Sequence, residues 1–145
     1  RTLSADRRHK VLPFIRDWAD SAANFSGTEV FDASQQFHLT RVATVRACNA
    51  FDFVISPVAP HVAFAAELPA PTNDPLRPLL HIGYTVPFNM SEQPASSINC
   101  GYTKAGLPIG LQIAGARFDD LGVLKASRAF EQIRDAQQPW PQPSA

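Results

Sequence analysis

Apolar residues in the first fifty positions recur every three or four residues, which is the period of a helix with one packed face. Within residues 1–25 the pattern starts at Pro13, and proline is favoured in the first turn of a helix. A second, long helix should follow Ser26 and run to about Asn49, because Ser26 and Glu29 have the spacing of a capping box. We interpret this helix as a packing element. The residues expected on its packed face are Val30, Ala33, Phe37, Leu39, Val42, Thr44, Val45 and Cys48.

Three short apolar runs bounded by turn residues predict three strands. We interpret Phe51–Pro57 as a buried strand that stops at its proline, which cannot donate a hydrogen bond to a neighbouring strand. Residues 95–100 and 109–114 are the other two strands, with a turn at 104–106 between them. The short connection favours antiparallel pairing of these two strands.

The chain is expected to end in a helix that follows Phe118 and uses Asp119 or Asp120 as its N-cap. Helices that alternate with about three strands indicate an α/β fold in which the helices flank the sheet. We assign residues 1–138 to one domain segment and the proline-rich residues 139–145 to a tail. The residues expected on the packed face of the final helix are Val123, Ala126, Phe130 and Ile133.

The connection between the first and second strands is long and has no clear hydrophobic period. Residues 58–86 are rich in alanine, proline and turn residues, and proline fixes the backbone angle φ. Loops of this length inside a compact domain are usually functional, or are ordered against a partner surface. We therefore expect residues 58–86 to lie at the surface or at the edge of a cleft.

The amino-acid composition argues against several classes of function. The 13 basic and 13 acidic residues cancel, and no apolar run is long enough to span a bilayer, so we expect neither nucleic acid nor a membrane as a partner. Cys48 and Cys100 are too few for a disulfide scaffold and lack partners at metal-ligand spacing. We expect a reducing cytoplasm, no metal and no cofactor. Charged residues make up 18% of the chain, below the typical value of about a quarter, which indicates a surface that more protein covers.

Four ordered motifs in the second half carry a resemblance to a known family. The sequence P-x-N-x-x-x-x-P-A spans Pro87 to Ala95, and C-G follows at position 100. G-L-P-I-G-L-Q-I spans Gly106 to Ile113, and the pattern G-x-x-F-x-D, with an apolar helix that ends in Glu131, comes after it. Together with F-D-F-V-I-S-P-V-A-P from position 51, this segment resembles the C-terminal portion of the amidase signature family.

The resemblance implies a partial amidase-type mixed sheet and a parent enzyme that hydrolyses carboxamide bonds. Enzymes of this family use a Ser nucleophile, a second Ser in a cis peptide and a Lys in the base system, all in their N-terminal half. The only lysines here are Lys10, Lys104 and Lys125, and none precedes a Gly/Ser-rich run. We therefore expect no catalytic residue in this chain, which would complete the sheet and one cleft wall and be inactive by itself. Its expected partners are the missing catalytic half and a small amide substrate.

The resemblance also points to substrate-binding candidates before and within the first motif. In the branch of the family that releases ammonia from glutamine, an acidic residue just before a T-V-P stretch holds the substrate's ammonium. Here no acid is available between position 81 and Thr85. We hypothesise that the complete enzyme does not prefer zwitterionic amino-acid amides. The candidate residues are His81, Ile82, Tyr84, Thr85 and Asn89, for which packing within the loop is the alternative.

Two positions depart from the family's usual pattern. Glu92 stands where family members usually have Gly, and Asn99 stands where they often have Pro. If the turn at Glu92 requires a positive φ, a residue other than glycine costs about 1 kcal/mol or more there. These departures weaken any transfer of substrate specificity, although they leave the expected fold unchanged.

Three other interpretations compete with an inactive amidase portion. A thiol hydrolase could use Cys100 with one of the four histidines, but nothing in the sequence pairs them, and a buried cysteine is the simpler interpretation. Ser96 and Ser97 lack flanking glycines and are interpreted as strand residues. The chain could also be a stand-alone, non-catalytic binding module derived from an amidase.

If the chain is part of a larger enzyme, strands that normally pair with the missing half have exposed edges. Such edges predict that two copies of the chain associate as a homodimer.

Overall fold

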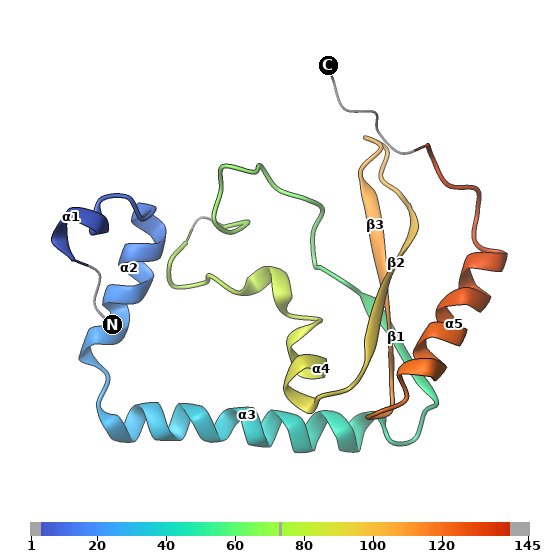
Figure 1. The fold of residues 1–145 in the computed structure, drawn as a ribbon, viewed down its shortest axis with the longest axis horizontal. Coiled ribbons are helices and arrows are strands. Elements are labelled where there is room, and N and C mark those ends of the chain that lie inside the picture. Colours follow the sequence, from blue (N-terminus) through green and yellow to red (C-terminus); the bar gives the residue numbers. More distant parts are fainter. Residues whose placement is uncertain (1–3, 73, 140–145) are drawn as a thin grey trace.

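A computed structural model of the chain describes residues 4–72 and 74–139 (Figure 1). The predicted tail at 139–145 therefore lies outside the described residues except for Pro139. The elements in chain order are α1 (Ala5–Arg8), α2 (Pro13–Ser21), the 3-10 turn η1 (Ala22–Asn24), α3 (Gly27–Cys48), β1 (Phe53–Pro57), the 3-10 turn η2 (Leu80–Ile82), α4 (Val86–Ser91), β2 (Ala95–Tyr102), β3 (Pro108–Gly115) and α5 (Asp120–Ile133).

The three strands form one sheet in the order β1-β3-β2, and both pairings are antiparallel. The predicted α/β class with three strands flanked by helices is confirmed, as is the antiparallel pairing of the last two strands. A tight turn joins β2 to β3, in which the Thr103 N–H donates to the Leu107 carbonyl at 2.9 Å. Gly106 has φ 82° in this turn, a backbone conformation that suits glycine.

The core lies between the sheet and α5. Helix α5 covers β2 and β3 on one side of the sheet, whereas α4 and the long connection lie on the other side (Figure 1). Ile98, Ile113 and Val123 are buried at the α5 side. A Cβ added to Gly115 would lie 2.8 Å from Val123 Cγ2, so glycine allows the close approach of α5. The predicted cap at Asp119 is confirmed, because its carboxylate accepts the Gly122 N–H at 3.0 Å.

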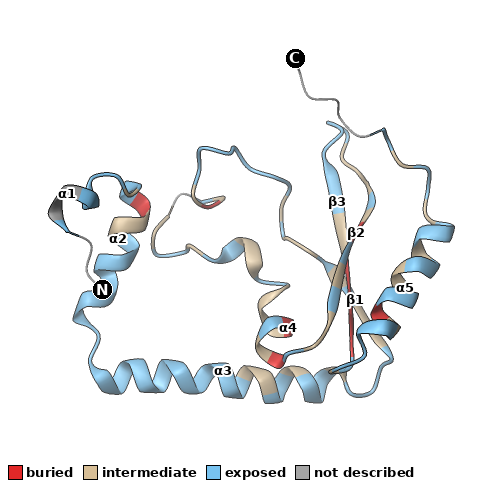
Figure 2. Cartoon of the chain, in the orientation of Figure 1, coloured by how far each residue is buried: buried red, intermediate tan, exposed pale blue. Residues whose placement is uncertain are grey.

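The long helix α3 has the predicted start but not the predicted burial. The capping box is present: the Ser26 N–H donates to Glu29 Oε2 at 2.8 Å, and the Glu29 N–H donates to Ser26 Oγ at 3.2 Å. No residue of α3 is buried, and most of the helix is exposed along its length (Figure 2). The predicted packed face is therefore wrong for this chain, because α3 extends well beyond the sheet and contacts α4 only near its C-terminal end.

Two further burial predictions are wrong for a related reason. The sequence predicts a buried strand at Phe51–Pro57, yet Ile55 is 64% exposed, because β1 is an edge strand and α5 packs on β2 and β3 instead. Ile133 is 81% exposed because it is the last residue of α5, beyond the part of the helix that packs on the sheet. Helix α4 is not predicted by the sequence pattern, since a six-residue helix that contains Pro87 shows no clear period.

Among the described residues, no helix combines the length and the apolar character that a membrane span requires.

Candidate functional site

The predicted substrate residues lie in η2 (His81 and Ile82), in the turn after it (Tyr84 and Thr85) and inside α4 (Asn89). The turn at Ile82 is held by its carbonyl, which accepts both the Thr85 N–H at 3.0 Å and the Thr85 hydroxyl at 3.1 Å. This segment faces residues 58–64, which leave the end of β1 on the same side of the sheet (Figure 1). Two stretches that are distant in the sequence are therefore brought together.

A pocket of about 310 Å³ lies between these two stretches. It is lined by residues 58–59, 61–64, 81–82 and 85, so it contains the predicted residues His81, Ile82 and Thr85. No lysine, arginine, aspartate or glutamate is among the residues that line it. Its volume is at the lower end of the range of small-molecule sites, about 300–1,000 Å³, and it is open to solvent, since Val62 and Phe64 are both exposed.

Three aromatic rings stand next to one another in this pocket. Phe64 lies edge-on to His61 and to His81, with both pairs of ring centroids 6.0 Å apart. His61 Nδ1 lies 3.1 Å from the Val62 carbonyl oxygen. His61 Nε2 and His81 Nδ1 are buried and have no hydrogen-bond partner among the described residues. Buried polar atoms are rarely left without a partner, which makes these two nitrogens the unusual polar groups of the pocket.

The other two predicted residues, Tyr84 and Asn89, are exposed and do not line this pocket. The Tyr84 carbonyl accepts a hydrogen bond from Gln112 Nε2 at 3.0 Å. The same nitrogen donates to Ser56 Oγ at 2.9 Å, and Gln112 is 4% exposed. Gln112 thus joins β1, β3 and the segment before α4 that carries His81, Ile82 and Thr85. The sequence placed Gln112 in a motif but gave no indication of this positioning role.

Glu92 forms an ion-paired cluster at the turn between α4 and β2. Its carboxylate accepts two hydrogen bonds of 3.0 Å from Arg41 of α3, and it also pairs with Arg117, which follows β3. Glu92 has φ 58°, so the turn does require the positive φ considered from the sequence. The Arg117 guanidinium also lies 5.0 Å from the centroid of the Phe118 ring. The cluster joins α3, the end of α4 and the connection between β3 and α5, although its half-exposed pairs contribute only modestly to stability.

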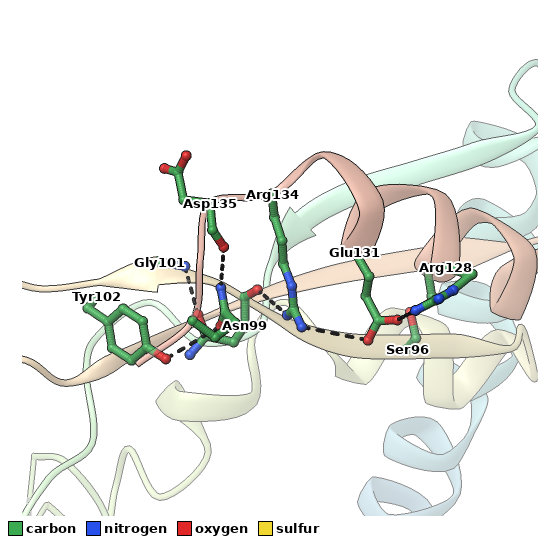
Figure 3. Close-up of polar contacts among 10 residues, drawn as sticks. Ser96, Asn99, Gly101, Tyr102, Arg128, Glu131, Arg134 and Asp135 are labelled. Atoms are coloured by element: carbon green, nitrogen blue, oxygen red, sulfur yellow. Dashed lines mark hydrogen bonds and ion pairs between the residues drawn. The ribbon is translucent and has the colours of Figure 1, made fainter. Parts of the chain in front are cut away.

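The second departure from the family pattern, Asn99, lies at an irregularity in β2 (Figure 3). Its side-chain oxygen accepts the Gly101 N–H at 2.8 Å, and its carbonyl accepts a hydrogen bond from Arg134 at 2.9 Å. The Ser96 and Ser127 hydroxyls are 2.7 Å apart and also join β2 to α5. These contacts attach α5 to the sheet on the side away from the pocket.

The alternative nucleophiles lie in strand positions. Ser96 and Ser97 are both in β2, and Ser96 is engaged with α5. Cys100 is exposed rather than buried, and its thiol donates to the Ile109 carbonyl at 3.4 Å. The hydrogen bonds of the described residues pair neither Cys100 nor Ser97 with a histidine. Across the same residues, no group of three histidine, cysteine, aspartate or glutamate side chains is placed to hold a metal ion.

Comparison with known proteins places this geometry in context. Residues 2–124 match the family described as Amidase. The chain is 43% identical over 97 residues, 67% of its length, to the A subunit of the glutamyl-tRNA(Gln) amidotransferase from Myxococcus xanthus. Among solved structures, a bacterial aryl acylamidase of the amidase signature family matches 90% of the chain with a TM-score of 0.75 and 26% identity. The corresponding amidotransferase chain from Thermotoga maritima matches 100% of the chain with a TM-score of 0.66 and 23% identity, which shows a shared fold.

The chain is much shorter than these proteins. It covers 20% of the Myxococcus xanthus protein, 28% of the aryl acylamidase chain and 32% of the Thermotoga maritima chain. The family match nevertheless spans most of the chain, and the fold agrees with that of the solved enzymes. This chain therefore belongs to the amidase signature family, as its motifs predicted.

Proposed function

We propose that this chain is the C-terminal part of a carboxamide hydrolase, completes the enzyme's central sheet, and forms one wall of the substrate cleft. The observation that carries this proposal is the pocket that gathers His81, Ile82 and Thr85 against residues 58–64. Residues 1–138 would form the segment of the amidase-signature domain, and 139–145 would form its tail. The coverage of the relatives supports a larger enzyme as the chain's partner.

The chain is proposed to be inactive by itself. Its three lysines, Lys10, Lys104 and Lys125, are not followed by a Gly/Ser-rich segment, and a serine needs a nearby base to act as a nucleophile. The remaining N-terminal half of the same enzyme would supply the two serines and the lysine. A reducing cytoplasm is the proposed location, and the free thiols of Cys48 and Cys100 fit that setting.

The exposed apolar surface supports a protein partner that packs directly against it. Phe31 and Phe37 of α3 and Ile55 of β1 are each more than half exposed, and β1 is an edge of the sheet. An edge strand with exposed apolar residues can pair with another chain. We propose that the catalytic half covers this surface in the complete enzyme, and that copies of the isolated chain associate through it as a homodimer.

The substrate of the complete enzyme is proposed to be a small amide that is not a zwitterionic amino-acid amide. Residues 81–84 contain no acid that could hold an ammonium group, and the pocket lined by His81, Ile82 and Thr85 has no lysine, arginine, aspartate or glutamate in its lining. Efficient hydrolysis of glutamine by the complete enzyme would contradict this proposal.

Two experiments test the proposed function. The purified chain should show no turnover of simple aliphatic and aromatic amides, in an assay where the bacterial aryl acylamidase serves as the positive control. A robust rate that is lost on Cys100→Ala or Ser97→Ala would overturn the proposal. Sequencing the gene upstream of the Arg1 codon should reveal a lysine followed by a Gly/Ser-rich segment. A stop codon with a start codon near Arg1 would instead favour a stand-alone binding module.

A further inference from the structure

We infer that residues 134–139, the edge clamp, close the outer edge of β2, and that copies of the chain therefore associate through β1 alone. The closure depends only on contacts within the chain. The association through β1 rests on the proposed function, to which the clamp adds which edge of the sheet a partner strand can use.

The three-stranded sheet has two edges that a further strand could extend. In the part of the chain that the structure describes, β1 and β2 are the outer strands. An edge strand presents backbone N–H and C=O groups that can pair with another chain. Pairing of β1 in one copy with β2 in the next would leave a free edge at each end, so copies would join in open rows. Closing β2 leaves only the two-fold pairing of β1 with β1, which stops at a dimer.

The strand register shows that the Asn99 carbonyl lies on the outer edge of β2. Asn99 is paired with Gly110 of β3, whose carbonyl accepts the Val58 N–H at 3.1 Å on the β1 side. Backbone groups of opposed residues in an antiparallel pair either face each other or both point away, so those of Asn99 point away from β3. The Arg134 guanidinium donates to this outward carbonyl at 2.9 Å. A partner strand would need the same carbonyl.

The side chain of Arg134 is held in place for this contact. Arg134 is the C-cap residue of α5, and its extended backbone turns the chain out of the helix. Its guanidinium also lies 3.7 Å from the Glu131 carboxylate. Arg128 pairs with the same glutamate but is 72% exposed, whereas Arg134 is 20% exposed (Figure 3). A charge fixed against a strand edge opposes the addition of another strand.

A second attachment holds the far end of the clamp. The Gln138 N–H donates to the Tyr102 hydroxyl at 3.1 Å, and this hydroxyl lies 3.4 Å from Gln137 Oε1, to which it donates. One hydroxyl can accept and donate at the same time. Tyr102 is the last residue of β2, three positions beyond Asn99. The clamp is therefore attached to β2 at its irregularity and again at its end.

Hydrogen exchange of the Gln138 backbone amide tests the clamp in the full 145-residue chain. Arg134→Ala should raise the exchange rate about tenfold or more, because the segment loses its other attachment and opens more often. Tyr102→Phe removes only a hydroxyl and should raise the rate as well. Arg128→Ala is the matched control and should leave the rate unchanged, since Arg128 is largely exposed. An unchanged rate in Arg134→Ala, or equal increases in the two arginine variants, would overturn the clamp.

The size of the associated species tests the one-sided association. The double variant Arg134→Ala/Tyr102→Phe should form species larger than a dimer as its concentration rises, as measured by sedimentation velocity. Wild type and Arg128→Ala should stop at the dimer. Adding Ile55→Lys to the double variant should remove the larger species, because β1 is the strand that a freed β2 would pair with.

The outcomes separate the clamp from the proposed function. A double variant that stops at the dimer, or whose larger species persist with Ile55→Lys, would overturn the one-sided association. A wild type that stays monomeric would refute the association through β1, and the exchange rates would still decide whether the clamp closes β2.

Discussion

Ile55 and Ile113 lie directly opposite each other on neighbouring strands, yet their surroundings differ completely. Ile113 of β3 is 3% exposed, whereas its partner Ile55 of β1 is 64% exposed. The two residues have the same side chain and the same sheet face, because paired antiparallel residues point to the same side. Strand pairing alone therefore does not bury a residue here. Burial requires the covering layer that α5 provides for β3 and β2.

The two main helices repeat this contrast. Helix α5 has Val123 buried against the sheet, whereas α3 has an apolar pattern but no buried residue. Within the described residues, α5 has the sheet as its packing partner, whereas most of α3 extends beyond the sheet and has none (Figure 2). A sequence with an apolar face and no cover in its own chain is consistent with the proposed position inside a larger enzyme.

The largest expected effect separates the two isoleucines. Ile113→Ala should lower the free energy of unfolding by about 2–5 kcal/mol, because it leaves a cavity beneath α5. Ile55→Ala should cost less than about 1 kcal/mol, since the side chain is already in water. Urea unfolding measures both values. Equal costs for the two variants would show that the edge strand β1 is also packed in solution.

The second prediction concerns the homodimer. Ile55→Lys places a charge on the exposed edge strand and should weaken self-association of the isolated chain by about tenfold or more. Sedimentation equilibrium measures this change, and Leu76→Lys is the control at an exposed position away from the edge. A wild-type chain that stays monomeric at the highest concentrations would refute the proposed association.

The third prediction tests the positive φ of Glu92, whose ion pairs link the exposed helix α3 to the connection between β3 and α5. Glu92→Gly relieves the positive φ and loses the ion pairs, so these effects should nearly cancel. Glu92→Ala keeps the strain and also loses the pairs, and should be less stable than the glycine variant by about 1 kcal/mol. Thermal unfolding in low salt compares the two variants. An alanine variant as stable as the glycine variant would contradict the strained turn.

The smallest expected effect lies at the start of α3. The backbone N–H and the hydroxyl of Ser26 donate to Glu29 and lower the pKa of its carboxyl below the ordinary value of 4.5. A lowered folded-state pKa stabilises the fold above the ordinary pKa, and this stabilisation disappears as the pH falls through the lowered value. The difference in melting temperature between wild type and Glu29→Gln should therefore shrink on acidification. A constant difference from neutral pH to acidic pH would contradict this assignment.

Much of the fold could be predicted because its signals are local. The capping box at Ser26, the turn at Gly106 and the cap at Asp119 depend on neighbouring residues, and all three are present. Helix α4 was missed because it is short and contains Pro87, so its stability comes from packing against α3 rather than from a period.

The candidate site could be predicted only in part. The motif context indicated His81, Ile82 and Thr85, but the residues that face them follow β1 and have no pattern of their own. Nothing in the sequence paired His61 with that segment. The role of Gln112 was equally hidden, because its amide bridges segments that only the folded chain brings together.

The sequence by itself determined the family, the order of the main helices and strands, and the caps and turns, since these depend on residues a few positions apart. Only the tertiary structure decided which apolar residues are buried, that Glu92 holds two arginines at a strained turn, and that two distant stretches form one pocket. The physical reason is that burial and pocket formation depend on which surfaces meet. An apolar pattern specifies that a surface should be covered, but it does not specify what covers it.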